Sequence, residues 1–266
     1  MHTYRIDPPG AYLAYHDFPG EDPVCLFLHG LGASSSADFP EIAAFPALRR
    51  YRSILVDFFG FGFSQRPHGF SYSLDAHART VVSLLKHLAI PHRSCVLIGH
   101  SMGGAVAITA AATTSSPFAG LVIAEGNLDA GGGIVSRPIA AQTETEFLSR
   151  GYAGFLRILD GRPHFSDYAA SVRAADPLAL HRSAVSLKEG TTPTMRERFV
   201  TLQVPRTYLF GEKSLPNTDQ QTLQQHGIAV DVVPAAGHNM MHDNSAGFAD
   251  ALAHAVTRCH NTGAGR

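Results

Sequence analysis

The sequence has almost no excess of charge of either sign. Lysine and arginine together number 21 and aspartate and glutamate 22, which gives a formal net charge of −1. Binding of nucleic acid or of an anionic membrane through overall charge requires a strong basic excess. We therefore expect no nucleic acid and no membrane partner, and a small, neutral or weakly polar molecule as the substrate. A homodimer is compatible with this composition.

Long apolar segments are also absent. The apolar runs stop well short of the ~20 residues that a bilayer-spanning helix needs. The first residues, MHTYRIDPPG, contain no basic stretch followed by an apolar core. This pattern predicts a cytoplasmic protein. Cysteine is scarce, and the scattered Cys25, Cys95 and Cys259 are expected to be buried free thiols.

Signals of cofactor and metal binding are missing as well. The chain has no G-x-G-x-x-G or Walker-type loop and no cysteine–histidine spacing typical of zinc. We therefore expect neither a cofactor nor a metal. What the chain does have is 45% hydrophobic and 16% charged residues, which is ordinary for a globular protein with a large core.

Short apolar runs alternate with helical patterns over residues 24–113. The runs at 53–56 and 96–98 are apolar without alternation, as expected of parallel strands that are covered on both faces. The stretch after Ser73 places apolar residues at helical spacing, with Ser73 as its N-cap. Strand-like runs resume later, at 120–124, 207–210 and 229–233. The order predicts an α/β fold with parallel pairing up to the last strand.

The pattern of apolar residues changes between residues 127 and 205. No strand-like run appears there, and the apolar residues recur at helical spacing. This segment is predicted to be a helical cap inserted in a core domain made of residues 1–126 and 206–266. Its aromatic residues could line a pocket, although each is more simply explained as helix core. They are Phe147, Tyr152, Phe155 and Phe165.

The sharpest motif is GHSMG at residues 99–103, which directly follows an apolar strand and directly precedes an alanine-rich helix. The flanking glycines let the chain turn so sharply that Ser101 points away from the sheet. The N-terminus of the following helix offers positive potential to a developing anion. In this setting the motif predicts a nucleophilic serine.

Together with three further segments, this motif resembles the α/β-hydrolase superfamily. The resemblance covers nearly the whole chain. The three segments are HGLG at 29–32, DFFGFGFS at 57–64 and AGH at 236–238. The resemblance implies a mostly parallel eight-stranded sheet flanked by helices, with an inserted helical cap. It also implies an oxyanion hole formed by the backbone N–H groups of Leu31 and Met102. Asp57 is expected to stabilise its own turn.

The general base has to be chosen among 15 histidines. His238 is preceded by a glycine in a short turn after the final strand, which is where the resemblance places the catalytic histidine. His242, four residues further on, is the alternative. We predict that His238 moves the proton.

The third member of the triad departs from the usual pattern. The run GEKS at 211–214 has Ser214 where the family commonly has an aspartate, and a serine cannot supply the charge that orients a histidine. Glu125 ends the neighbouring strand and could reach the same histidine. This arrangement looks like that of zearalenone lactonase, so Glu125 is the predicted acid. Glu212, Asp129 and Asp243 remain alternatives.

These residues predict a serine hydrolase that cleaves a carboxylic ester or lactone of a small, largely apolar molecule. Carbon–carbon bond hydrolysis of the ring-cleavage type, or a non-catalytic small-molecule receptor on the same fold, are the alternatives. Haloalkane dehalogenases and epoxide hydrolases share the expected fold but carry an aspartate at the position of Ser101. The chain also lacks tryptophan, so the indole halide clamp of dehalogenases is absent.

Overall fold

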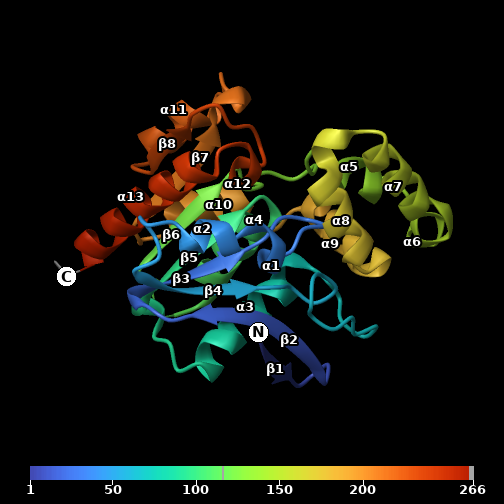
Figure 1. Ribbon diagram of the computed structural model, residues 1–266, viewed down its shortest axis with the longest axis horizontal. Coiled ribbons are helices and arrows are strands. Elements are labelled where there is room, and N and C mark those ends of the chain that lie inside the picture. The colour runs from blue at the N-terminus through green and yellow to red at the C-terminus, as the bar shows by residue number, and fades with distance from the viewer. Residues whose placement is uncertain (116, 264–266) are drawn as a thin grey trace.

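The computed structural model describes residues 1–115 and 117–263. Its centre is one eight-stranded sheet (Figure 1) with the order β1-β2-β4-β3-β5-β6-β7-β8. The pairs β1–β2 and β2–β4 are antiparallel and the other pairs are parallel. The mostly parallel α/β fold predicted from the sequence is thereby confirmed. The strands are β1 His2–Ile6, β2 Ala11–Phe18, β3 Glu21–Leu28, β4 Tyr51–Val56, β5 Cys95–His100, β6 Gly120–Ala124, β7 Arg206–Gly211 and β8 Ala229–Val233.

The central strands are apolar throughout because each of their faces is buried against helices. In β5, Cys95 and Leu97 belong to one hydrophobic core, whereas Val96 and Ile98 belong to the core on the opposite face. Successive side chains of a strand point to opposite faces, so a doubly covered strand shows no polar alternation. The three cysteines are free and buried, as predicted.

Helices cover both faces. One core includes α3 and α4, and the other includes α2 and α13. Ser73 caps α3 by accepting a hydrogen bond from Ala76 N at 3.2 Å, which confirms the predicted helix start. No helix within the described residues is long and apolar enough to cross a membrane. The bounds outside the segment between β6 and β7 are α1 Ser35–Asp38, α2 Pro40–Ala44, α3 Leu74–His87, α4 Met102–Thr113, α11 Asp219–Gln225, α12 Met240–Asp243 and α13 Ser245–Gly263.

The segment between β6 and β7 is helical. Figure 1 shows α5 to α9 gathered to one side of the sheet, well apart from β1 and α13. Strands are absent from this segment, all of which the structure describes. Its helices are α5 Ser136–Ala140, α6 Glu144–Glu146, α7 Tyr152–Asp160, α8 Ser166–Ala174, α9 Pro177–Glu189 and α10 Met195–Thr201, and a π-helical turn, Phe147–Gly151, joins α6 to α7.

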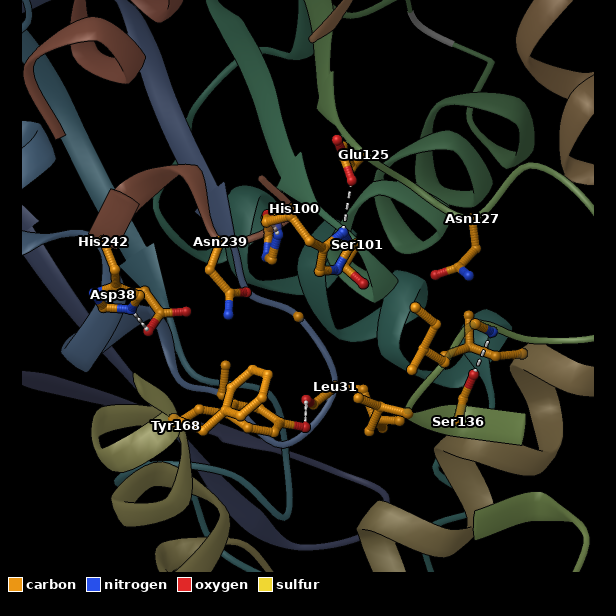
Figure 2. A pocket seen from close by; sticks show the side chains of 18 of the residues that line it. Leu31, Asp38, His100, Ser101, Glu125, Asn127, Ser136, Tyr168, Asn239 and His242 are labelled. Carbon is orange, nitrogen blue, oxygen red and sulfur yellow. Dashed lines mark hydrogen bonds and ion pairs between the residues drawn. The ribbon is translucent and has the colours of Figure 1, made fainter. Parts of the chain in front are cut away.

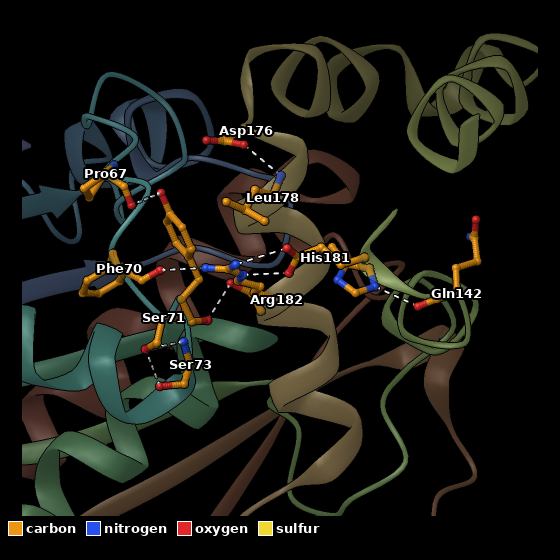
Figure 3. Close-up of polar contacts among 12 residues, drawn as sticks. Pro67, Phe70, Ser71, Ser73, Gln142, Asp176, Leu178, His181 and Arg182 are labelled. Atoms are coloured by element: carbon orange, nitrogen blue, oxygen red, sulfur yellow. Dashed lines mark hydrogen bonds and ion pairs between the residues drawn. The ribbon is translucent and has the colours of Figure 1, made fainter. Parts of the chain in front are cut away.

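Polar contacts of α9 join this helical segment to the rest of the protein (Figure 3). Arg182 pairs with Glu144 (Nε–Oε2, 2.8 Å) and donates a hydrogen bond to the Phe70 carbonyl at 3.3 Å. Ser183 Oγ–H donates to the Tyr72 carbonyl at 3.0 Å. Helix α9 is therefore fixed to the loop that precedes α3. This contact positions the helices between β6 and β7 relative to the sheet.

Candidate active site

Ser101 stands in the sharp turn between β5 and α4. Its φ of 52° and ψ of −116° lie in a region that L-residues rarely adopt. The turn needs glycine on both sides, because a Cβ at Gly99 would lie 2.4 Å from Gly103 O and one at Gly103 would lie 2.1 Å from Leu28 O. Ser101 Oγ has no hydrogen-bond partner among the described residues, and Ser101 lines a cavity. The sequence motif thus produces the turn that it predicts.

Glu125 lies directly after β6, at the same edge of the sheet. Its Oε2 accepts a hydrogen bond from His238 Nδ1 at 2.9 Å, and its Oε1 accepts one from Gly211 N at 2.9 Å. The side chain is only 12% exposed. Burial raises its pKa, but hydrogen bonding with His238, Ser214 and Gly211 outweighs burial, so the net effect is a lowered pKa. The contact predicted between Glu125 and the histidine is present.

His238 is oriented from two sides. Because Glu125 accepts the hydrogen bond from Nδ1, the other ring nitrogen is left with a lone pair in the neutral imidazole. The His238 carbonyl accepts a hydrogen bond from His100 Nε2–H at 2.8 Å. Burial and the neighbouring His238 lower the pKa of His100 to about 3, which keeps His100 neutral. Residue 100, within the serine motif itself, thus fixes the backbone of the histidine.

Two backbone N–H groups near Ser101 are free. Among the described residues, neither Leu31 N nor Met102 N has a hydrogen-bond acceptor. His29 holds the loop before Leu31, because its Nε2 accepts from Phe58 N at 3.0 Å and its Nδ1–H donates to Gly30 O at 2.8 Å. Leu31 and Ser101 line the same cavity, so the Leu31 N–H is available to a ligand there, and the Met102 N–H belongs to the first residue of α4, directly after Ser101.

The loop that carries Leu31 also touches the helices between β6 and β7. Tyr168, from α8, donates a hydrogen bond from its hydroxyl to the Leu31 carbonyl at 2.8 Å (Figure 2). Of the four aromatic residues considered from the sequence, Phe165 lines the cavity, whereas Phe147 is fully buried in the core and Tyr152 and Phe155 pack against it. The inserted segment therefore forms part of the cavity wall, mostly through residues that the sequence did not single out.

The alternative acids are engaged elsewhere. Glu212 accepts a hydrogen bond from Ala235 N at 2.7 Å, and Asp243 accepts one from Gly237 N at 2.6 Å. Asp129 pairs with Arg196 (Nε–Oδ1, 2.9 Å). The alternative histidine is engaged too, as His242 Nε2 lies 3.3 Å from Asp38 Oδ1. These contacts leave Glu125 as the carboxylate that meets His238.

Asp57 holds its own turn, as the sequence predicts. Its carboxylate is buried and accepts hydrogen bonds from Ser36 N at 2.9 Å, Ser36 Oγ at 2.7 Å and Phe63 N at 2.9 Å. These bonds join the loop after β4 to α1. Asp57 makes no contact with the Glu125–His238 pair, and it is not among the residues that line the cavity.

Replacing Asp57 by alanine should lower the free energy of unfolding by about 3 kcal/mol, because three part-buried hydrogen bonds to its carboxylate are lost. Urea denaturation at neutral pH measures the loss. Asp250→Ala, at an exposed position of α13, is the matched control and should change stability by less than about 0.5 kcal/mol. Equal stability of the two variants would show that the turn does not depend on the carboxylate.

The cavity has a volume of about 400 Å³ and brings the predicted residues together. Ser101, Glu125, His238 and Leu31 all line it, as do five polar side chains that the sequence did not indicate: Asp38, Asn127, Ser136, Tyr168 and Asn239. Of the residues near Asp38 and Asn239 in this cavity, the sequence pointed only to His242, as the alternative base. Within the described residues, no group of three or more His, Cys, Asp or Glu side chains is arranged to hold a metal ion.

The sequence matches a known protein family. A family model described as "Alpha/beta hydrolase family" matches residues 25–251. The mesoderm-specific transcript protein of Mus musculus is 40% identical over 88 residues, which are 33% of this chain and 26% of that protein. The chain thus matches about a quarter of the length of this curated relative.

Solved structures match nearly the whole chain. A thermophilic esterase from Thermogutta terrifontis, with malate bound, superposes with a TM-score of 0.79 at 21% identity and covers 98% of this chain and 100% of its own. A mutant of the N-acyl homoserine lactonase AidH in complex with N-hexanoyl homoserine gives 0.76 at 21% identity, with 97% of each chain covered. At this identity the likeness establishes the shared fold.

Proposed function

Because the chain belongs to the alpha/beta hydrolase family and is an enzyme of that fold, we propose that it is a serine hydrolase that cleaves a carboxylic ester or lactone of a small, largely apolar molecule. The observation that carries the proposal is the 2.9 Å hydrogen bond between Glu125 and His238 in the cavity that Ser101 lines. Ser101 is the nucleophile, His238 the general base and Glu125 the acid that orients it. Residues 127–205 act as the cap.

The proposed reaction gives each of these groups one role. His238 Nε2 takes the Ser101 hydroxyl proton while Oγ attacks the carbonyl carbon. The carbonyl oxygen becomes an oxyanion and accepts hydrogen bonds from the free N–H groups of Leu31 and Met102. Each of these donors can contribute ~3 kcal/mol of transition-state stabilisation. Glu125 stabilises the imidazolium that forms, and its lowered pKa keeps it ionised for that role.

The second half of the reaction releases the acid. His238 gives its proton to the leaving alcohol oxygen, and the acyl group remains on Ser101 Oγ. A water molecule then loses a proton to His238 and attacks the acyl carbon, and Ser101 regains its proton as the carboxylic acid leaves. All bonds are made and broken with the protein's own residues and water, so the mechanism requires no cofactor.

The test is hydrolysis of p-nitrophenyl esters from acetate to octanoate, together with intact-mass and peptide-mass analysis after treatment with a fluorophosphonate. We expect turnover and a single covalent adduct on the peptide that contains Ser101. An adduct without ester turnover would favour the carbon–carbon hydrolase or a narrow lactonase. Absence of both would favour the receptor, because an intact Ser101–His238–Glu125 arrangement should react with the probe.

A further inference from the structure

One wall of the active-site cavity carries polar side chains that the proposed acyl transfer does not use. Asp38 is the last residue of α1, and Asn239 and His242 lie at the start and within α12. All three line the cavity. Figure 2 shows Asp38 and His242 on one side of Ser101 and Asn127 and Ser136 on the other. The wall is formed by segments that lie about two hundred residues apart in the chain, with a separation of 204 between Asp38 and His242.

Asp38 is the buried member of this group. Its side chain is 9% exposed, and its Oδ1 contacts His242 Nε2 at 3.3 Å. Within the described residues its Oδ2 has no hydrogen-bond partner, and Figure 2 shows this second oxygen turned toward the cavity. This oxygen faces water in the cavity, and a bound ligand that displaces the water leaves the carboxylate unpaired unless the ligand supplies a donor. The donor that fits is a group on the ligand.

His242 fixes the orientation of this carboxylate. The hydrogen bond with Asp38 raises the pKa of His242 against the opposing effect of burial, and the charges of Asp38, Asp167 and Asp243 raise it further. The imidazole therefore serves as a donor to Oδ1 and leaves Oδ2 as the free acceptor. Beside it, the Asn239 amide has no hydrogen-bond partner among the described residues.

The other side of the cavity, where Figure 2 shows Asn127 and Ser136, also has apolar side chains. Val135 and Leu187 line it, together with Ile134, which is 96% exposed and so retains apolar surface for a ligand to cover. A ligand with its carbonyl at Ser101 would therefore place two chemically different substituents on opposite sides. The leaving oxygen must lie within reach of His238, which lines the same cavity as Asn239 and His242 at the start of α12. The polar wall accordingly lies on the side of the alcohol portion.

We propose that Asp38 is a specificity-determining residue that accepts a hydrogen bond from a hydroxyl or amide N–H on the alcohol portion of the substrate, while the acyl portion lies against Ile134, Val135 and Leu187. The proposal rests on the serine-hydrolase function proposed above and names its substrate class. The substrate is an ester or lactone with an apolar acyl chain and an alcohol portion that carries a hydrogen-bond donor.

Three hexanoate esters of nearly equal size test this proposal: 3-hydroxypropyl, butyl and 3-methoxypropyl. The hydroxypropyl ester has a donor, the methoxypropyl ester has only an acceptor and the butyl ester has neither. We expect the wild-type kcat/KM for the hydroxypropyl ester to exceed that of the other two by about tenfold or more, since a charged acceptor would otherwise be left unpaired. Release of hexanoate measures all three rates.

Asp38→Ala should bring the three kcat/KM values to within about twofold of one another. Asp38→Asn, which keeps the size of the side chain, should reduce the preference for the donor. Asp250→Ala is the matched control, because it removes an exposed carboxylate that does not line the cavity, and it should retain the wild-type preference.

Fluorophosphonate labelling of the wild type separates a failure of the proposed role of Asp38 from a failure of the proposed serine-hydrolase function. Labelled Ser101 and ester turnover with equal kcat/KM for the three esters would overturn the role of Asp38 and leave the serine hydrolase standing. A preference that survives in Asp38→Ala would also overturn it. Failure of both labelling and turnover would contradict the proposed serine hydrolase, and with it the proposed substrate class.

Discussion

Replacing Ser101 by alanine should lower kcat for p-nitrophenyl butyrate by about four to six orders of magnitude, because the atom that forms the acyl-enzyme is removed. Leu31 and Met102 would still offer their N–H groups to a carbonyl oxygen, so a small residual rate above that of water is expected. Covalent labelling by the fluorophosphonate should disappear completely. Initial rates and intact mass measure the two effects.

The fold should survive this change. Alanine at position 101 takes on the same backbone strain that serine already bears at a φ of 52°, and Ser101 Oγ makes no hydrogen bond within the described chain. The melting temperature of the variant should therefore stay close to that of the wild type. Ser149→Ala, at an exposed position of the segment between β6 and β7, is the matched control and should keep full activity. Substantial turnover by Ser101→Ala would contradict the mechanism.

Glu125→Gln should lower kcat by about two to four orders of magnitude with a small change in KM. Glutamine has nearly the shape of glutamate and can still accept the hydrogen bond from Gly211 N. It has no charge to stabilise the imidazolium, and its amide can hold His238 in the wrong tautomer. A lower kcat at similar KM is the signature of an interaction that acts mainly in the transition state. Steady-state kinetics on one ester measures both constants.

Glu212→Gln is the control for a general effect of charge. Glu212 lies in the turn after β7, close in the chain to Ser214, but its carboxylate accepts from Ala235 N and does not contact His238. We expect its kcat to remain within about threefold of the wild type. If Glu125→Gln turned over ester as fast as the wild type, the acid would have to be assigned elsewhere.

The lowered pKa of Glu125 also gives the wild type a pH-dependent stability that Glu125→Gln lacks. A carboxylate whose pKa is depressed in the folded state contributes stability above its unfolded pKa, which is 4.5 here, and loses it as pH falls through the folded value. The stability difference between wild type and Glu125→Gln should therefore be largest at neutral pH and shrink below pH 4.5. Urea denaturation at several pH values provides the comparison.

The sequence by itself determined the features that rest on local signals. The apolar runs without alternation predicted the doubly covered strands, and Ser73 marked the start of α3. The glycines around Ser101 predicted the sharp turn, because its geometry depends on contacts within a few residues and on one close approach to β3. By contrast, β1 and β2 were not identified. They form an antiparallel pair at the sheet edge, and their mixed polar and apolar residues give no strong periodic pattern.

Only the tertiary structure decided which side chains meet. Residue types and strand order made Glu125 a candidate acid, but its contact with His238 exists because β6, β7 and β8 are neighbours and end at the same edge of the sheet. The pairing of Asp38 with His242 had no counterpart in the sequence, since the two residues belong to different helices at opposite ends of the chain. Local patterns fix backbone conformation within a few residues, whereas contacts between distant residues depend on how the whole sheet and its helices pack, and the walls of the cavity consist of such contacts.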